Sequence, residues 1–196
     1  MNQIQFLENL YNFYNRELFE NKLPDVVISF SRDSNVSGVF LPEKWQSNNN
    51  PIHEISINPD YFEANSIDFH QTIVHEMCHI YQFENGTPGK NGYHNKEFSE
   101  IMFSIGLQTS DSGTENGNPT GYKMSDYIIE DGSFVSAFKK IQEHGYTIPS
   151  VKPIRSRKKH FGGVRSKYTC KCGYNIWGKS GLKIMCKNCK SDFEEN

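Results

Sequence analysis

The sequence has few cysteines and no long hydrophobic segment. Only five of its 196 residues are cysteine, too few and too unevenly spaced for a disulfide-stabilised fold. No apolar run approaches the roughly 18 residues that a membrane-spanning helix needs, so we expect no membrane protein. The first residues also lack the basic and then apolar pattern of a secretory signal, which predicts a cytoplasmic location. The aromatic content of 13% favours a folded chain over a disordered one.

Charge is unevenly distributed along the chain. Residues 1–149 carry nine Lys and Arg against twenty Asp and Glu, whereas residues 150–196 carry twelve against three. The net charges of the two parts are therefore −11 and +9. An acidic body with a basic C-terminal part predicts that this part meets a polyanion, with nucleic acid as the first candidate. The alternative is that the charge only aids solubility.

Hydrophobic periodicity predicts helices mixed with a few short strands. Helices are expected over 3–20, from Asn65 or Ser66 to just before Gly86, over 96–106 and over 133–143. Strands are expected over 25–31, 37–41 and 53–58, with loops over 46–51 and 108–121. We therefore predict an α+β fold in three parts: a catalytic domain over 1–149, a basic linker over 150–168 and a small cysteine module over 169–196.

The main motif is His75-Glu76-Met77-Cys78-His79, an HExxH pattern within the second predicted helix. Residues i and i+4 project from the same helical face, so the two imidazoles can bind one zinc ion. Glu76 lies beside them and can act as general base on a zinc-bound water. A chance match on a buried helix is the alternative. We expect Cys78, between the two histidines, and His70 to be structural.

A catalytic zinc ion normally has three protein ligands and one open position for water. The third ligand does not follow the metzincin spacing, because Gln82 and Asn85 occupy the positions of its glycine and third histidine. His94 follows a glycine-rich loop that can turn the chain back toward the metal, so it is the preferred ligand. Glu97 and Glu100 are alternatives.

These motifs resemble the SprT-like metalloproteases, whose eukaryotic relatives are the Spartan proteases. The likeness rests on HEMCH followed after fourteen residues by His94 in Gly-Tyr-His-Asn-Lys-Glu-Phe, and it extends over about 4–106. It implies a zincin-like domain in which His75, His79 and His94 bind zinc and Glu76 is catalytic. It also implies proteolysis of DNA-bound proteins, including crosslinked ones, a substrate class that the spacing itself does not indicate.

The C-terminal part contains two close cysteine pairs, Cys170 with Cys172 and Cys186 with Cys189. Four thiolates in this arrangement suit a tetrahedral structural zinc site and define a zinc-ribbon-like module. Two disulfides or unrelated thiols are the alternatives, although a cytoplasmic chain disfavours disulfides. Because so short a segment has little core, metal binding would supply much of its folding energy.

Basic and aromatic residues surround this module. Cations on phosphates and aromatic rings on unpaired bases are the means of gripping single-stranded DNA. The candidate DNA contacts are Arg155, Arg157, Lys158, Lys159, Arg165, Lys167 and Trp177. The alternative is that Tyr168 and Trp177 only pack the module.

The leading hypothesis is a cytoplasmic zinc endopeptidase with one catalytic and one structural zinc ion. Glu76 takes a proton from water and passes it to the leaving amine. The strand at 53–58 is expected at the sheet edge, where a substrate peptide could pair with it. The expected partners are DNA-bound proteins and DNA, preferably single-stranded or junction DNA. The alternatives are a DNA-binding zinc adaptor with little peptidase activity, and a toxin-like or mobile-element factor.

Overall fold

The computed structural model describes residues 3–30, 36–58, 60, 66–143 and 165–196. The chain divides into two compact units, Met1–Pro153 and Ile154–Asn196. The predicted linker over 150–168 lies mostly outside the described residues, and its boundaries stay a prediction. None of the helices in the described ranges is long and apolar enough to cross a membrane.

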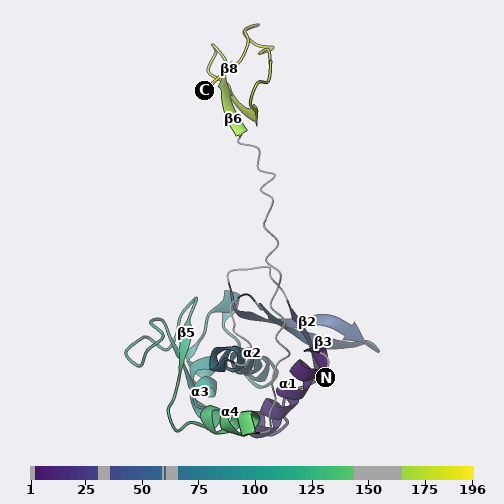
Figure 1. The fold of residues 1–196 in the computed structure, drawn as a ribbon, viewed down its shortest axis with the longest axis vertical. Coiled ribbons are helices and arrows are strands. Elements are labelled where there is room, and N and C mark those ends of the chain that lie inside the picture. Colours follow the sequence, from purple (N-terminus) through teal and green to yellow (C-terminus); the bar gives the residue numbers. More distant parts are fainter. Residues whose placement is uncertain (1–2, 31–35, 59, 61–65, 144–164) are drawn as a thin grey trace. The chain divides into compact units, whose positions relative to one another are not determined.

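The N-terminal unit combines helices with small sheets, which confirms the predicted α+β class (Figure 1). Its helices are α1 (Gln3–Phe19), α2 (Ile67–Asn85), α3 (Lys96–Ser104) and α4 (Ser133–Glu143), with a short 3₁₀ turn at Lys90–Gly92. Its strands are β1 (Val26–Phe30), β2 (Gly38–Ser47), β3 (Asn50–Ile57), β4 (Leu107–Ser110) and β5 (Ser125–Ile128). All four predicted helices are present, within two residues of their expected ends.

The first sheet has the strand order β1-β3-β2. Strand β3 pairs in parallel with β1 and antiparallel with β2, so it is the central strand. The prediction that 53–58 lies at the sheet edge is therefore wrong. The predicted loop over 46–51 is also shorter than expected, because β2 and β3 continue through it to a turn at Asn48 and Asn49. Both asparagines have positive φ, 49° and 67°, a conformation that asparagine tolerates better than most residues.

Helix α2 is the central helix of this unit. Its N-terminus is capped by Ser66, whose side chain accepts a hydrogen bond from the Phe69 N–H. Its apolar side chains Phe69, Ile73, Met77 and Ile80 are buried, and they pack with Ile55 and Ile57 of β3 in one continuous core. Figure 1 shows α2 between the β1-β3-β2 sheet and the other helices. This packing fixes which face of α2, and hence which of its polar side chains, can form a site.

Strands β4 and β5 form a hairpin that the sequence does not predict. The polar composition of 108–121 suggests a mobile loop, yet Thr109 and Ser110 are buried in β4. Their hydroxyl groups donate hydrogen bonds to the backbone oxygens of Pro119 and Thr114. Because these local bonds offset the cost of burying polar groups, a polar segment can form a buried strand here.

The C-terminal unit is a three-stranded sheet of order β7-β6-β8. Its strands are β6 (Arg165–Thr169), β7 (Asn175–Lys179) and β8 (Glu194–Glu195). Residues 165–168, which the sequence places in the linker, thus belong to this sheet. Tyr168 is 1% exposed, and its hydroxyl hydrogen-bonds the Lys179 backbone oxygen and the Glu195 carboxylate, so it packs the module.

Candidate metal centre

Three histidines of the N-terminal unit come together as the spacing predicts. His75 and His79 project from α2 one turn apart, and His94 reaches them from the segment before α3. The His94 backbone is held by Gly121, through His94 N–H to Gly121 O at 2.9 Å and Gly121 N–H to His94 O at 3.0 Å. The His94 Nε2 atom lies 3.3 Å from His75 Nε2 and 3.1 Å from His79 Nε2.

These distances fit a single zinc ion. Zn–N bonds of about 2.0–2.1 Å at tetrahedral angles place two nitrogen ligands about 3.3 Å apart. Burial holds the pKa of His79 well below its usual value and lowers that of His94 to about 4. Both rings are therefore neutral near pH 7, as metal ligands must be. The donor set and its spacing are compatible with zinc.

The two alternative ligands, Glu97 and Glu100, take other partners. Both carboxylate oxygens of Glu97 accept hydrogen bonds from the Thr87 N–H, at 3.0 and 3.1 Å. Glu100 is exposed and forms an ion pair with Lys96 on its own helix. Neither joins the group of histidines, so the arrangement favours His94 as third ligand.

Gln82 has a specific role although it replaces the metzincin glycine. Its side chain is buried and donates a hydrogen bond of 2.8 Å to Asn95 Oδ1. Asn95 follows His94 and caps α3, because its Oδ1 also accepts from the Phe98 N–H. The contact links α2 to the residue beside His94, which steadies the approach of the third histidine.

Glu76 is buried next to His75 and faces strand β2. Its carboxylate accepts a hydrogen bond from the Phe40 N–H. Burial raises the pKa of Glu76 to about 7, while His75 and the Phe40 N–H act in the opposite direction. Gly38 of β2 leaves room for this side chain, since a Cβ there would lie 3.1 Å from Glu76 Oε1 and 2.7 Å from Thr72 Cγ2. Edge strand β2, and not β3, therefore borders the candidate general base.

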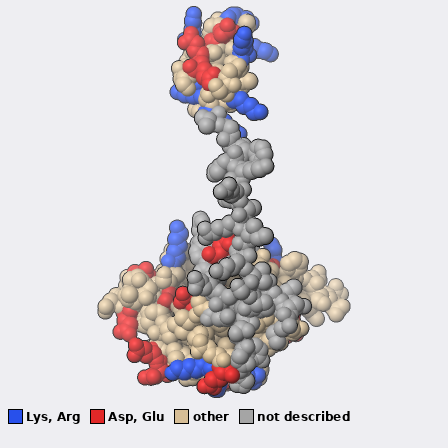
Figure 2. Space-filling view, viewed as in Figure 1, with Lys and Arg blue, Asp and Glu red and all other residues tan. Residues whose placement is uncertain are grey.

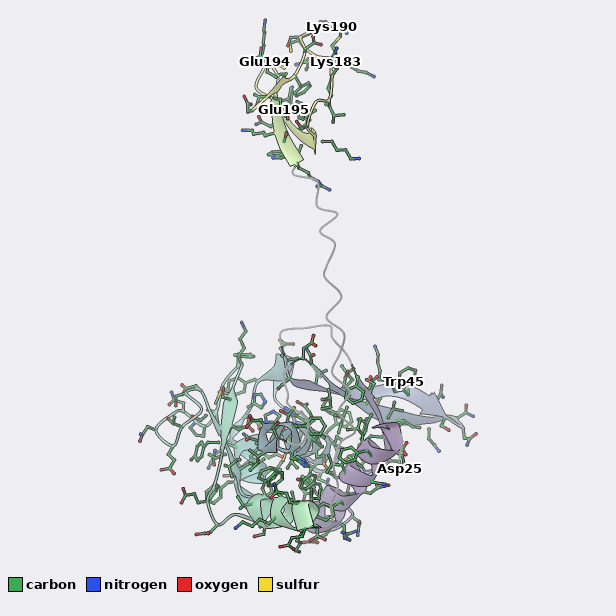
Figure 3. All side chains as sticks on the ribbon, viewed as in Figure 1. Asp25, Trp45, Lys183, Lys190, Glu194 and Glu195 are labelled. Atoms are coloured by element: carbon green, nitrogen blue, oxygen red, sulfur yellow. The ribbon has the colours of Figure 1, made fainter. Side chains whose placement is uncertain are left out.

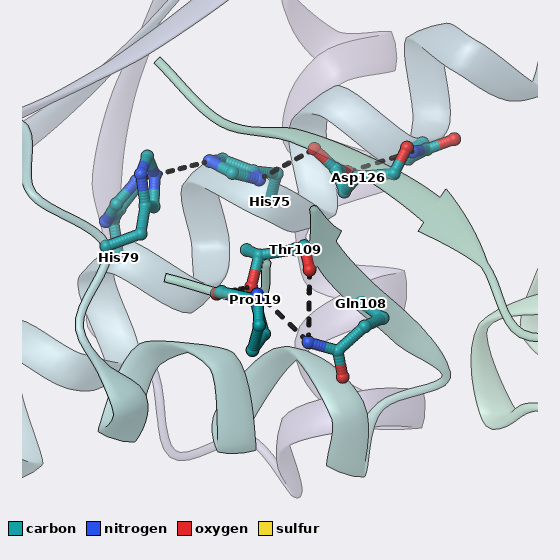
Figure 4. Close-up of polar contacts among 8 residues, drawn as sticks. His75, His79, Gln108, Thr109, Pro119 and Asp126 are labelled. Carbon is teal, nitrogen blue, oxygen red and sulfur yellow. Dashed lines mark hydrogen bonds and ion pairs between the residues drawn. The ribbon is translucent and has the colours of Figure 1, made fainter. Parts of the chain in front are cut away.

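Asp126 is a further residue of the site, and no sequence motif indicates it. Its Oδ1 atom lies 3.3 Å from His75 Nδ1 (Figure 4). Burial alone would lower the pKa of His75, but the Asp126 and Glu76 carboxylates together outweigh burial and raise it to about 9, so a metal ion that binds this ring would displace a proton from it. Asp126 belongs to β5, a strand without a clear hydrophobic pattern, and no spacing to the HExxH motif points to it.

The residues predicted to be structural are placed accordingly. Cys78 is fully buried, and His70 is 1% exposed with its Nδ1 atom 2.9 Å from the Tyr14 hydroxyl. Tyr93, next to His94, packs edge-to-face against Tyr122, and both rings are exposed.

The four cysteines of the C-terminal unit form a second candidate metal group. Their sulfur atoms all lie within 4.8 Å of one another, as four ligands of one ion require. All five cysteines of the chain are free thiols, so the disulfide alternative is not realised. The cluster is compatible with a structural zinc site.

The predicted DNA contacts are only partly described. Arg155, Arg157, Lys158 and Lys159 lie outside the described residues. Arg165 and Lys167 are on β6, where they pair in register with Lys179 and Trp177 of β7, so all four side chains share one face of the sheet. The Trp177 side chain is 62% exposed and is therefore not a packing residue of the module, unlike Tyr168. Figure 2 shows further Lys and Arg on this unit, and Figure 3 labels two of them, Lys183 and Lys190.

Similarity to a known protein family covers more than half of the chain. The model of the SprT-like family matches residues 7–119, which include the three histidines and Glu76. Asp126 and the four cysteines lie outside this segment. No curated protein matches the chain.

Proposed function

The chain belongs to the SprT-like family, and from this premise we propose that it is a zinc-dependent endopeptidase that acts on DNA-bound proteins. The observation that carries the peptidase proposal is the convergence of three histidine Nε2 atoms beside a buried glutamate. A family of this kind is associated with metalloprotease activity. The substrate class and the DNA partner are the further parts of the proposal.

The residues divide the chemistry among them. A zinc ion held by His75, His79 and His94 would polarise the scissile carbonyl and lower the pKa of its bound water. Glu76 takes the proton of the attacking water and delivers it to the leaving amine nitrogen. The raised pKa of Glu76 suits this exchange, because a group that accepts and then returns a proton works best when its pKa is near the working pH.

We place the substrate peptide along β2, in place of the β3 edge that the sequence predicts. Strand β2 is at the edge of its sheet and contributes the Phe40 N–H to Glu76. A peptide added to this edge is held mainly by backbone hydrogen bonds, which select little among side chains. The register shift between Leu41 and Trp45 limits the regular edge to the first residues of β2. We therefore expect short, extended segments of unfolded protein as substrates.

Selectivity would then come from DNA binding by the C-terminal unit. Arg165, Lys167 and Lys179 share one sheet face with the exposed Trp177, and Lys167 lies directly opposite it. Cations bind phosphates without regard to sequence, and an exposed indole ring can stack on an unpaired base. This arrangement supports a preference for single-stranded or junction DNA. We propose a cytoplasmic location for the protein, as the sequence predicts.

The peptidase proposal is tested with Glu76→Gln. The amide is nearly isosteric with the carboxylate but accepts no proton, so the variant should retain zinc and lose turnover. The assay is digestion of a DNA-binding protein with and without DNA, alongside zinc analysis of both proteins. Cleavage by the variant at the wild-type rate would refute the role of Glu76. Absence of cleavage by zinc-loaded wild type would favour the adaptor alternative.

The DNA proposal is tested with Trp177→Ala. Loss of one stacked base should weaken binding to single strands by about 1–3 kcal/mol and change binding to intact duplex little. The matched control is Met185→Ala, since Met185 is 63% exposed in the same unit but has no aromatic ring. Fluorescence anisotropy with both DNA forms across a salt series measures the effect. Equal single-strand affinity of the two variants would contradict stacking by Trp177.

A further inference from the structure

The hairpin β4–β5 contacts the candidate metal centre at two points. Asp126 of β5 lies 3.3 Å from His75 Nδ1, and Gly121, in the loop between the strands, forms two backbone hydrogen bonds with His94. The hairpin thus reaches one histidine through its side chain and the other through its backbone. Both contacts lie beyond the segment that the family model matches.

Asp126 is itself held firmly in place. The Gln71 amide donates hydrogen bonds to Asp126 Oδ2 at 2.9 Å and to the Asp126 backbone oxygen at 3.0 Å. Gln71 lies on α2 one turn before His75, so the two ends of the Asp126 carboxylate meet two side chains of the same helical face. The carboxylate is only 14% exposed, which limits competition from water.

The geometry also separates the two nitrogens of His75. Its Nε2 atom faces the other histidines, whereas its Nδ1 atom faces Asp126 (Figure 4). A carboxylate at Nδ1 selects the tautomer with the proton on that nitrogen, leaving the Nε2 lone pair available to a metal. The Nδ1 atoms of His75 and His94 are both buried, and neither makes a regular hydrogen bond among the described residues. His94 differs in that only the Nδ1 atom of His75 has a carboxylate within ion-pair distance in this part of the chain.

From these contacts we propose that Asp126 is a positioning residue that orients His75 and fixes its tautomer for zinc binding. This proposal rests on the zinc site of the proposed function. Asp126 does not touch the reacting atoms. It acts through His75, and Gln71 in turn holds Asp126. Loss of such an outer partner typically weakens metal binding by roughly 10- to 100-fold.

The test is zinc affinity of the full-length chain, measured by competition with a chromophoric chelator. Two candidate sites should give two zinc affinities. The affinity that is lost in His79→Ala belongs to the three-histidine site. Asp126→Asn keeps the size of the side chain and an oxygen for Gln71 but removes the charge, so zinc affinity at this site should fall by roughly 10- to 100-fold. Asp126→Glu should bind more tightly than Asp126→Asn. Asp131→Asn, an exposed carboxylate elsewhere in the same unit, should match wild type.

A second measurement needs no variant. In zinc-loaded wild type, nitrogen NMR of labelled histidine should show the His75 proton on Nδ1 and the metal on Nε2. A proton on Nε2 would overturn the proposal, as would an Asp126→Asn affinity within twofold of wild type in a folded protein. If the wild-type protein binds no zinc at the three histidines, the proposed peptidase function is refuted. If it binds zinc there but Asp126→Asn does not weaken the binding, only the role of Asp126 is refuted.

Discussion

The stability of the N-terminal unit should depend on pH through His70. This side chain is 1% exposed, its Nδ1 atom lies 2.9 Å from the Tyr14 hydroxyl, and it packs against Phe138. Burial lowers the pKa of His70 to about 4, whereas an unfolded histidine has a pKa of about 6.5. The unfolded chain therefore binds the proton more readily over this range, and acid favours unfolding.

The size of the effect follows from this difference in pKa. The contribution of His70 is fully present above about pH 6.5, declines as the pH falls, and levels off below about pH 4. At about 1.4 kcal/mol for each pH unit, the free energy of unfolding should fall by about 3 kcal/mol between pH 7 and pH 4 on account of His70 alone.

His70→Phe removes the titrating group and keeps a ring in the core. The variant leaves the Tyr14 hydroxyl without its partner, which costs about 1–3 kcal/mol, but that cost is the same at every pH of the series. Urea unfolding of both proteins is followed by circular dichroism from pH 7 to pH 4, and pH effects common to both, including zinc release, cancel in the difference. A wild-type-minus-variant difference that stays constant within about 0.5 kcal/mol would refute the reasoning.

Three further predictions concern the metals and the glycines. Metal-replete protein should contain two zinc ions per chain and Cys186→Ser only one by elemental analysis, and an unchanged count would remove the cysteine site. Gly106→Ala should destabilise the protein by about 1–3 kcal/mol more than Gly92→Ala in urea unfolding, because both have positive φ but only Gly106 is crowded, with a Cβ 2.8 Å from the Ser133 nitrogen. Equal losses would contradict the crowding. Gly38→Ala should displace Glu76 and lower turnover on the order of 10- to 100-fold with zinc retained, and wild-type turnover would count against this placement of Glu76.

Much of the helical part of the fold can be predicted from the sequence. The apolar stripe and Ser66 cap of α2 are local signals, and the HExxH spacing needs only the helical period. The approach of His94 depends on a glycine-rich turn and a capping Asn95, which are also local. These caps, spacings and turns can be predicted because residues close together in the sequence determine them.

The strand order and Asp126 cannot be predicted in this way. A strand of alternating pattern looks the same whether it lies at the centre or at the edge of a sheet, so the pattern of β3 does not reveal its central place. Strand β4 buries Thr109 and Ser110 by means of hydrogen bonds to a loop several residues away. The contact between Asp126 and His75 depends on the β4–β5 hairpin, which the sequence does not predict. No spacing in the sequence therefore connects Asp126 with His75, 51 positions earlier.

Helix α2 tolerates substitution at its exposed positions but no change in length within its central turns. Gln71, His75, Glu76, His79 and Gln82 all depend on the direction in which each side chain leaves the helix. Each added or deleted residue turns everything beyond it by about 100°. One inserted residue between Gln71 and His75 would separate the two side chains that contact Asp126. One between His79 and Gln82 would break the hydrogen bond from Gln82 to Asn95. Insertions and deletions compatible with folding should therefore fall outside this segment, for example at the Asn48-Asn49 turn.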